Sequence, residues 1–444
     1  MRKDIQGTFR AEIIDMALPE NWAVVKKDGA VCFIPDGMGV VGDKVKVKPL
    51  KKQKNYFLGE IIKIEEDSPF KIKPECPHFY RCGGCVMQNI RYDKQLEIKA
   101  KYLKKTLKSM GNVSENLLED LSITPSKDIF GYRNKMEYSI ARYNGKIEIG
   151  LKERVSPLKQ YSQQITPINE CAIFGKVSAT VFEIFKKFAT ATMKVEYKKL
   201  VLKRGANTGE IMVVLVTRNG EVIHIDGLAQ QMKDAIAELK SFYWIEERKG
   251  RRFDRIKRIF GQEYIEETIS GIKCKIYPQT FFQTNTHIAQ LIYEKVSQFA
   301  GKTCQILGLY CGSGMMEMCL SKKTGNIVGI DSDLANIKSA LQNCQSNSIE
   351  NCKFYHSRVE NIRKPSFEPD LLLINPPRIG LTKKAIQQVF ALNIPRIIYV
   401  SCSPATLARD IKKFQNNSYT PKKIDAFDMF PHTSHIETVV FLEK

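Results

Sequence analysis

The sequence lacks apolar runs of the length that membrane insertion requires. Its first residues, MRKDIQGTFRAEIID, contain no apolar run of signal-peptide length, and no later stretch reaches the ~18 continuous apolar residues of a membrane span. Internal repeats and low-complexity linkers are also absent from the sequence. We therefore expect a cytoplasmic protein that has no membrane partner.

Acidic residues are few relative to basic ones. The chain has 48 aspartates and glutamates against 69 lysines and arginines, which gives a formal net charge of +21 and a pI near 9.3. This charge favours phosphate-rich partners, although a basic codon bias would explain part of the excess. In four clusters the basic residues mix with apolar ones, as on the faces of folded elements: Lys44–Lys54, Lys99–Lys108, Lys194–Arg204 and Arg251–Arg258.

At 444 residues the chain has room for two or three domains. Residues 7–66 form short alternating segments between Gly, Asn and Asp turns, which is typical of a small all-β barrel. A helix is predicted from about Asp93 to Met110, and an α+β region with a helix near 175–190 over roughly 130–275. After Thr280, buried runs alternate with helical patterns, which indicates a mostly parallel, doubly wound sheet: CQILGLY, NIVGID, LLLIN, RIIYVSC and TVVFL.

A glycine-containing turn, Tyr310–Gly314, follows the first of these strands, and the next strand ends in Asp331. In such sheets ligands bind at the carboxyl ends of the strands, where glycines let the backbone approach and an acid can accept hydrogen bonds from ribose hydroxyls. The pattern predicts an adenosine-type ligand. By itself it leaves open whether that ligand is a dinucleotide or S-adenosylmethionine.

Cys402 differs from most of the twelve cysteines in its position. The strand RIIYVSC carries it to the carboxyl edge of the sheet, and Ser403-Pro404 fits the N-cap and first position of the next helix. The positive end of that helix, together with nearby cations, is expected to stabilise a nucleophilic thiolate. Six others are interpreted as small buried hydrophobic residues: Cys32, Cys274, Cys304, Cys319, Cys344 and Cys352.

Three further segments bring polar side chains to this region. FPHTSHIETVV places His432, His435 and Glu437 just ahead of the terminal strand. Glu437 is a candidate base only in combination with the other polar residues of this region. LLLINPPRIGL puts Asn375 at another strand end, and TFFQTN opens the domain with Gln283.

Taken together, these segments resemble the RNA uracil-5 methyltransferases, which include the RlmD-like (RumA-like) ribosomal enzymes and the TrmA-like transfer-RNA enzymes. The resemblance covers almost the full length and is most specific for the pair SCSPATLARD and FPHTSHIETV. It implies an α/β fold class: a Rossmann-like class I methyltransferase domain (276–444), preceded by a TRAM- or OB-like β-barrel (1–68) and a central α+β domain (69–275). The segments that carry it are the barrel, KPECPHFYRCGGCVMQ, YRNKMEYSI, FFQTN, LYCGSG, NPPRIG, SCSPATLARD and FPHTSHIETV.

The resemblance also implies residue roles. Cys402 adds to C6 of a uracil, C5 takes the methyl group of S-adenosylmethionine, and Glu437 removes the C5 proton. C5 of uracil is a poor nucleophile without such an adduct, so a thiolate and a base suit this chemistry. The implied donor-binding residues are Gln283, Tyr310, Gly312, Asp331 and Asn375. The implied partner is RNA, first of all 23S ribosomal RNA, whose target base must leave its stack. We expect a monomer that does not bind DNA.

The cysteine loop supplies Cys76, Cys82 and Cys85 in the pattern C-x5-C-G-G-C. In the RlmD-like branch a fourth cysteine completes a [4Fe–4S] site, and Cys171 in INECAIF matches it. Thiolate-only ligation suits iron–sulfur, with structural zinc as the alternative. Methyl transfer needs no redox step, so the expected role is structural or RNA-positioning.

The sequence departs from the usual family pattern mostly on the donor side. Where this chain has Gly308 and Asn375, the family usually has Asp, and where it has Asp331, the family usually has Glu. Where this chain has Arg358 and Ser403, the family usually has Asn, and where it has Met315, the family usually has a small residue or Asn. Gln283, Cys402 and Glu437 follow the pattern. An amide at Asn375 can still accept from an imide N–H and donate to a carbonyl.

Three alternatives remain. The first is methylation of the T-loop of transfer RNA. The second is a non-methylating RNA-binding homologue, which would have no reason to keep Cys402 and Glu437. The third is an iron–sulfur redox enzyme, which predicts a flavin or second cluster motif that the sequence does not contain.

Overall fold

The structure is a computed structural model that describes residues 7–35, 37–143, 145–154, 164–191, 195–218, 222–247, 255–301, 305–362 and 367–444. The chain forms two compact units. The first comprises Met1–Tyr102, Ile149–Ile168 and Phe430–His435, and the second comprises Leu103–Glu148, Asn169–Met429 and Ile436–Lys444. Of the sequence-based interpretations, those for Cys304, Lys194 and residues 251–254 lie outside the described residues. The predicted domain boundaries near 68 and 275 stay a prediction.

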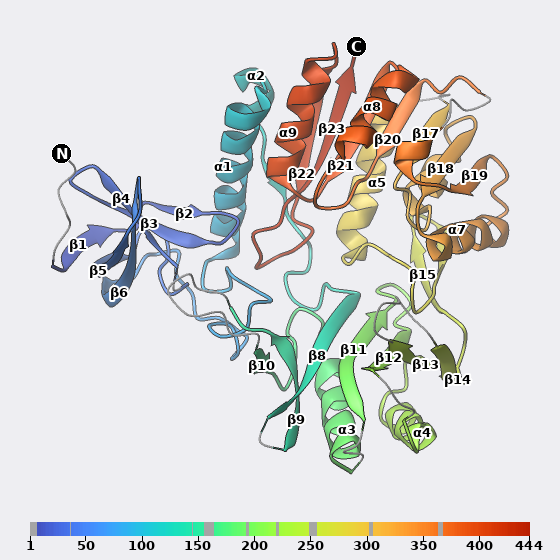
Figure 1. The fold of residues 1–444 in the computed structure, drawn as a ribbon, viewed down its shortest axis with the longest axis horizontal. Helices are drawn as coiled ribbons and strands as arrows, with labels where there is room; N and C mark the ends of the chain where they lie inside the picture. Colours follow the sequence, from blue (N-terminus) through green and yellow to red (C-terminus); the bar gives the residue numbers. More distant parts are fainter. Residues whose placement is uncertain are drawn as a thin grey trace. The chain divides into compact units, whose positions relative to one another are not determined.

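Six strands form the sheet of the first unit, in the order β1-β5-β6-β4-β3-β2 (Figure 1). They are β1 (Phe9–Glu12), β2 (Asp15–Ala17), β3 (Trp22–Lys27), β4 (Ala30–Ile34), β5 (Lys44–Lys52) and β6 (Phe57–Glu66). Alternate side chains point into one core, to which Met87, Ile90 and Ile98 also contribute. The predicted short strands over 7–66 are confirmed, and their assignment to the TRAM type stays a prediction.

Strand β9 (Lys146–Lys152) pairs antiparallel with β10 (Ile165–Pro167), and from Ile149 on these residues belong to the first unit. Helix α1 (Tyr92–Gly111) confirms the helix predicted at about 93–110. Its residues up to Tyr102 belong to the first unit and the rest to the second.

In the second unit a mixed sheet runs in the order β8-β11-β12-β13-β14. Its strands are β8 (Lys135–Tyr143), β11 (Glu196–Arg204), β12 (Ile211–Arg218), β13 (Leu239–Glu247) and β14 (Arg255–Gly261). Only β12 and β13 pair in parallel, with helix α4 (Ile225–Ala235) between them in sequence. Helix α3 (Val177–Ala191) matches the helix predicted near 175–190, so the α+β interpretation is confirmed.

The second sheet of this unit has eight strands in the order β19-β18-β17-β20-β21-β23-β22-β7, with helices on both faces (Figure 1). The five strands from β19 to β21 are parallel, and β23 is antiparallel to both neighbours. The strands are β7 (Ile123–Thr124), β17 (Ile306–Leu309), β18 (Ile327–Asp331), β19 (Cys352–His356), β20 (Leu371–Ile374), β21 (Arg396–Ser401), β22 (Thr420–Phe427) and β23 (Glu437–Glu443). The predicted doubly wound, mostly parallel sheet is confirmed.

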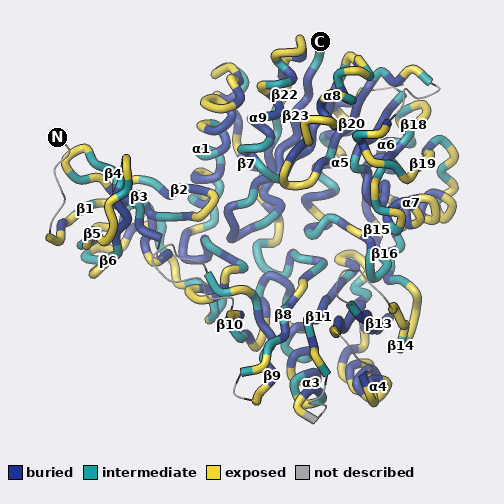
Figure 2. The backbone as a smooth tube through the Cα atoms, in the orientation of Figure 1, coloured by how far each residue is buried: buried dark blue, intermediate teal, exposed yellow. Residues whose placement is uncertain are grey.

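Shorter elements and helices complete the second unit. They are the helices α2 (Glu115–Leu118), α5 (Thr286–Ala300), α6 (Met315–Leu320), α7 (Leu334–Ser346), α8 (Lys383–Leu392) and α9 (Pro404–Gln415), the 3-10 turn η1 (Val359–Asn361) and the hairpin β15 (Ile265–Ile269) and β16 (Ile272–Ile276). Figure 2 shows the central strands buried and the outer sides of the helices exposed. Because the carboxyl ends of parallel strands meet at one edge, residues that follow β17, β18, β20 and β21 gather there.

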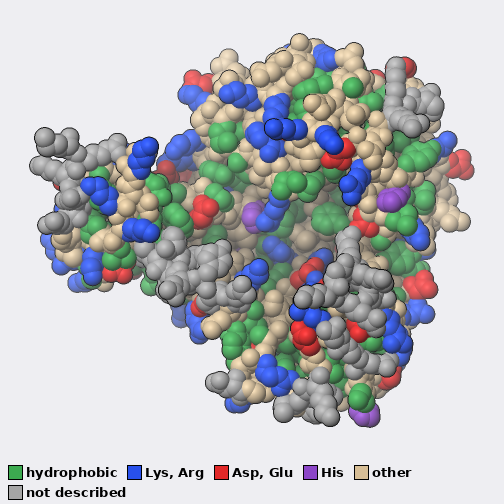
Figure 3. Space-filling model, in the orientation of Figure 1, with side chains coloured by type: hydrophobic (Ala, Val, Ile, Leu, Met, Phe, Trp, Pro, Cys, Tyr) green, Lys and Arg blue, Asp and Glu red, His purple; other side chains and the backbone are tan. Residues whose placement is uncertain are grey.

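Basic side chains lie at the surface of each unit (Figure 3). Two strands expose runs of them: Lys44, Lys48, Lys51 and Lys52 in β5, and Arg255, Lys257 and Arg258 in β14. Among the described residues, no helix has both the length and the apolar character to cross a membrane.

Candidate active site

The loop after β17 adopts a backbone conformation that glycine favours. Tyr310, Gly312 and Gly314 have φ angles of 59°, 57° and 73°, a region that glycine enters freely and tyrosine rarely. A Cβ on Gly314 would lie 2.5 Å from the ring of Phe354, so only glycine fits there. Tyr310 carries strain, which is common where a ligand is held.

Asp331 ends β18 and is hydrogen-bonded to this glycine loop. Its Oδ2 accepts from the Gly312 N–H at 3.0 Å, and its Oδ1 accepts from the Asp333 N–H at 2.8 Å. Each oxygen keeps a second lone pair, so Asp331 can also accept from a ligand hydroxyl. Burial, followed by the charges of Glu360, Asp410 and Asp331, raises the pKa of Tyr310 to about 12, so its phenol is neutral at physiological pH.

Gln283 lies in the segment between β16 and α5. Asn134 of the YRNKMEYSI segment donates from Nδ2 to the Gln283 carbonyl at 2.7 Å and to Thr286 Oγ1 at 3.0 Å. Two residues earlier, Phe281 faces the glycine loop, since a Cβ on Gly312 would lie 3.7 Å from its ring. The structure thus brings the FFQTN segment beside the glycine loop and gives Asn134 a positioning role that the sequence did not reveal.

Asn375 follows β20 at the same edge of the sheet. Its N–H donates to the carbonyl of Leu309 at 3.1 Å, which sets it beside the start of the glycine loop. Because β20 pairs in parallel with β17, the two segments leave the sheet next to each other. The predicted donor-side residues therefore lie on adjacent strand ends.

The departure from the family pattern at Gly308 has a local reason. A Cβ on Gly308 would lie 2.4 Å from Oε1 of Glu317 in α6, so the Glu317 carboxyl fills the space of a strand side chain. Glu317 is only 2% exposed. Burial, with a smaller contribution from the charge of Asp331, raises its pKa to about 8. The sequence analysis did not single out Glu317.

Cys402 and Glu437 are brought together by strand register. Ser401, the last residue of β21, pairs with Thr438 of β23, and the strands are antiparallel. The residue after Ser401 therefore lies across from the residue before Thr438. These two residues are Cys402, half-buried, and Glu437, which is 4% exposed.

The expected stabilisation of the Cys402 thiolate was wrong for the resting protein. Burial first, and then the Glu437 carboxylate, raise the pKa of Cys402 to about 11, and these effects outweigh Arg378, which lowers it. Ser403 is the N-cap of α9, but its side chain makes no capping bond; instead the Ser403 N–H donates to Ser401 Oγ at 3.2 Å. The short reach of the helix dipole does not offset the loss of water around the sulfur.

Burial also raises the pKa of Glu437, to about 8, and Arg378 opposes this shift. At neutral pH most of this carboxyl is therefore protonated, and a minority is available as a base. A carboxylic acid held near the operating pH can both take up and release a proton.

The sequence analysis did not single out Arg378, which lies beside both Cys402 and Glu437. Its side chain hydrogen-bonds Cys402 and faces Glu437. Helix α9 fixes the loop that carries it, because Thr406 Oγ1 donates to the Arg378 carbonyl at 3.1 Å and Asp410 Oδ2 accepts from the Leu381 N–H at 2.9 Å. The available signal was a cation just beyond the end of β20, which neighbours the strand of Cys402.

The predicted metal-ligating cysteines divide between the units: Cys76, Cys82 and Cys85 lie in the first and Cys171 in the second. Among the described residues, no group of three or more His, Cys, Asp and Glu side chains has the arrangement of a metal site. The Gly84 N–H donates to Cys82 Sγ at 3.4 Å. A Cβ on Gly83 would lie 2.9 Å from the Lys152 carbonyl, so the Gly-Gly pair is needed for the close packing of this loop.

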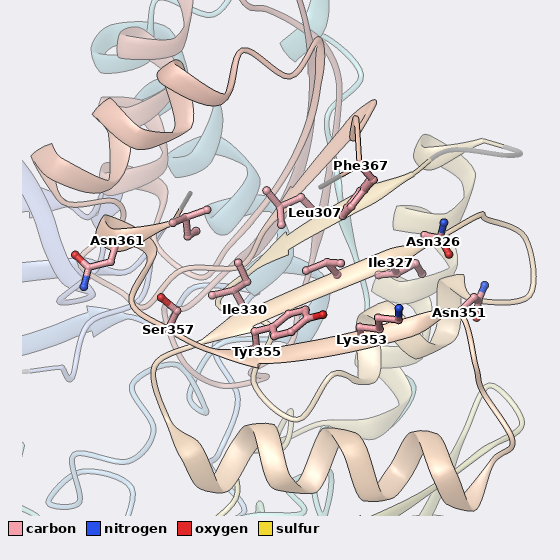
Figure 4. Close-up of a pocket in the computed structure, with 12 residues that line it drawn as sticks. Leu307, Asn326, Ile327, Ile330, Asn351, Lys353, Tyr355, Ser357, Asn361 and Phe367 are labelled. Atoms are coloured by element: carbon pink, nitrogen blue, oxygen red, sulfur yellow. The ribbon is translucent and has the colours of Figure 1, made fainter. Parts of the chain in front are cut away.

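A separate cavity of about 400 Å³ lies against β17, β18 and β19 (Figure 4). Val328, Ile330 and Tyr355 line it. The intervening Gly329 and Phe354 point to the other face, where Phe354 packs under Gly314. Because none of the candidate site residues lines this cavity, we assign it no part in the chemistry.

The comparisons with known proteins cover nearly the whole chain. The family model "tRNA (Uracil-5-)-methyltransferase" matches residues 91–444. Uncharacterized RNA methyltransferases of Caldanaerobacter subterraneus and Clostridium acetobutylicum are 32% and 33% identical, over 91% of this chain and 92% and 91% of their own lengths.

One solved structure is similar over both chains. The Pyrococcus abyssi tRNA (uracil-54, C5)-methyltransferase, in complex with S-adenosyl-L-homocysteine, has a TM-score of 0.77 and 28% identity, over 97% of this chain and 99% of that one. With the family match, this confirms an α/β methyltransferase fold. The chain belongs to the tRNA (uracil-5-)-methyltransferase family.

Proposed function

We propose that this protein transfers a methyl group from S-adenosylmethionine to C5 of a uridine in RNA. The observation that carries the proposal is the register of β21 and β23, which sets a thiol across from a buried carboxyl, with Arg378 hydrogen-bonded to the thiol. A nucleophile and a base that act at the two neighbouring carbons C5 and C6 need this proximity.

In the proposed reaction the Cys402 sulfur forms a bond to C6, and the electron pair of the C5–C6 double bond moves toward C5 and O4. C5 then bonds the methyl carbon, while the sulfonium takes the electrons of the broken carbon–sulfur bond. Glu437 accepts the C5 proton. The double bond re-forms, and the sulfur leaves C6 with its electron pair, next to the Arg378 cation that favours the thiolate.

The donor is proposed to bind at the carboxyl edge of β17, β18 and β20. The glycine loop, which begins with Tyr310, offers backbone N–H groups, and Asp331 offers carboxylate oxygens for ribose hydroxyls. Gln283 and Asn375 are the other residues proposed to bind the donor.

The test of this function is covalent trapping. RNA that contains 5-fluorouridine cannot lose its C5 substituent as a proton, so the adduct persists. We expect a complex stable on a denaturing gel with the native protein and S-adenosylmethionine, and none with Cys402→Ala. A trapped complex with the alanine variant would place the nucleophile elsewhere.

Two RNA substrates are candidates. The N-terminal sheet with the cysteine loop favours 23S ribosomal RNA, and the similarity to the P. abyssi tRNA enzyme favours the T-loop of transfer RNA. Methylation of each transcript in vitro, with 5-methyluridine located by mass spectrometry, separates them. If neither RNA is methylated and calorimetry shows no donor binding, the protein is a non-methylating RNA-binding homologue.

A [4Fe–4S] cluster held by Cys76, Cys82, Cys85 and Cys171 is part of the proposal. Support comes from the buried positions of three of these thiols and from the N–H donated to Cys82 Sγ, since such bonds are typical of ligating sulfurs. The purified protein should be brown, with broad absorbance near ~400 nm. A colourless protein with stoichiometric zinc would overturn the iron assignment.

The proposed role of the cluster is structural. Val86 and Met87, directly after Cys85, donate from their N–H groups to the His432 carbonyl at 2.8 and 3.0 Å. The segment that contains His432 leads in sequence into β23, which begins with Glu437. A rigid cysteine loop would therefore steady the segment just before the proposed base.

A further inference from the structure

The buried carboxyl of Glu317 is the feature that the proposed reaction does not use. Glu317 lies in α6, one turn after Gly314, and its Oε1 occupies the space next to Gly308 in β17. Its carboxyl accepts a hydrogen bond from the backbone N–H of Glu317, but Oε2 is buried and has no hydrogen-bond partner among the described residues. Burying a carboxylate with one unpartnered oxygen is costly, so a structural filler at this position would be expected to be apolar.

No cation compensates this carboxyl within the described structure. The titratable groups that interact with it come from β18, α5, the glycine loop, α6, α7 and β19: they are Asp331, Tyr293, Cys311, Cys319, Cys344 and Cys352. None carries a positive charge, and Asp331 carries a negative one. The Glu317 carboxyl therefore has no positively charged partner among the described residues.

We propose that Glu317 is a positioning residue for the methyl donor, neutral in the free protein and ionised when the cationic donor is bound at the loop Tyr310–Gly314. This inference rests on the proposed function. S-adenosylmethionine carries a sulfonium and an ammonium against one carboxylate and has a net charge of +1, whereas S-adenosylhomocysteine is neutral overall. Glu317 would then favour the substrate over the product by charge, and a proton would leave the site when the donor binds.

The sign of the effect follows from linkage. The pKa of Glu317 is raised to about 8 in the free protein, and a nearby positive ligand lowers it again. At an effective dielectric constant of ~20, a charge ~12 Å away changes the pKa by about one. At pH 7.5 the donor should then release about half a proton per site, and its affinity should rise about sevenfold from pH 6.5 to 9.

The test is isothermal titration calorimetry on the full chain in phosphate and in Tris, whose ionisation enthalpies differ. We expect proton release with S-adenosylmethionine and much less with S-adenosylhomocysteine. In Glu317→Gln the difference between the two ligands should disappear, and the affinity for S-adenosylmethionine at pH 8.5 should fall about tenfold. Glu437→Gln is the matched control, because its carboxyl titrates in the same range but lies beside Cys402, and it should retain the difference.

The outcomes are distinguishable. If the native protein binds no donor, the proposed function and this inference both fail. If the native protein binds the donor but Glu317→Gln releases the same number of protons and binds equally well, only the role of Glu317 fails. Glu317→Met, of similar length and without an ionisable end, gives the same comparison if the glutamine variant does not fold.

Discussion

Cys402 in the free protein is expected to react slowly with iodoacetamide, because alkylation proceeds through the thiolate. The pKa of Cys402 is raised from the ordinary 9.0 to about 11. At any pH well below both values, a thiol with a pKa of 11 is ionised about a hundred times less often than one with a pKa of 9. We therefore expect alkylation of native Cys402 to be slower than that of the same cysteine in urea-unfolded protein, by up to about a hundredfold where Glu437 is ionised.

Two variants test the causes separately. Glu437 raises the pKa of Cys402, but its own pKa is about 8, so it is mostly neutral at pH 7 and mostly ionised at pH 9. Glu437→Gln should leave alkylation at pH 7 nearly unchanged and accelerate it several-fold at pH 9. Arg378 lowers the pKa of Cys402, so Arg378→Ala should slow alkylation at both pH values.

The assay is peptide mass spectrometry of the fragment that contains Cys402, sampled over time at each pH. It separates this cysteine from the other eleven. If native Cys402 is alkylated as fast as in the unfolded chain, the reasoning from burial is refuted. A Glu437→Gln effect of equal size at pH 7 and pH 9 would refute the charge state assigned to Glu437.

Three further results are expected. Glu437→Gln, given ordinary RNA and S-adenosylmethionine, should accumulate a methylated covalent complex visible on a denaturing gel, because the C5 proton stays in place; rapid turnover by this variant would remove Glu437 from the mechanism. Asn375→Asp should keep or raise methylation activity measured with tritiated donor, and a large loss would show that the amide has a dedicated role. Glu317→Gln should gain stability relative to the native protein as the pH rises from about 5 to 8, by about 1.4 kcal/mol per pH unit. The reason is that the folded pKa of about 8 keeps the native carboxyl protonated at pH values where the same carboxyl in the unfolded chain has lost its proton. Urea unfolding at pH 5.5 and 7.5 measures this, and a constant difference would mean that Glu317 is ionised in the folded state.

Local patterns in the sequence were sufficient for the order and type of the main elements. Buried runs such as ILGL and LLLI, each too short for a helix and bounded by turn residues, indicated parallel strands, and both are fully buried in the structure. The glycine turn and the acid of the next strand indicated a nucleoside site, because the carboxyl ends of parallel strands meet at one edge. These inferences succeed since each depends on residues close together in the chain.

What only the tertiary structure decided depends on residues far apart in sequence. The antiparallel insertion of β23 beside β21, and not its hydrophobic pattern, sets Glu437 across from Cys402. Burial of Cys402 reverses the expectation made from the helix end alone, since desolvation depends on every element packed around a group. Arg378 and Glu317 carry no motif of their own; they gain a role only where α9 fixes the Arg378 loop and β17 leaves room for the carboxyl at Gly308.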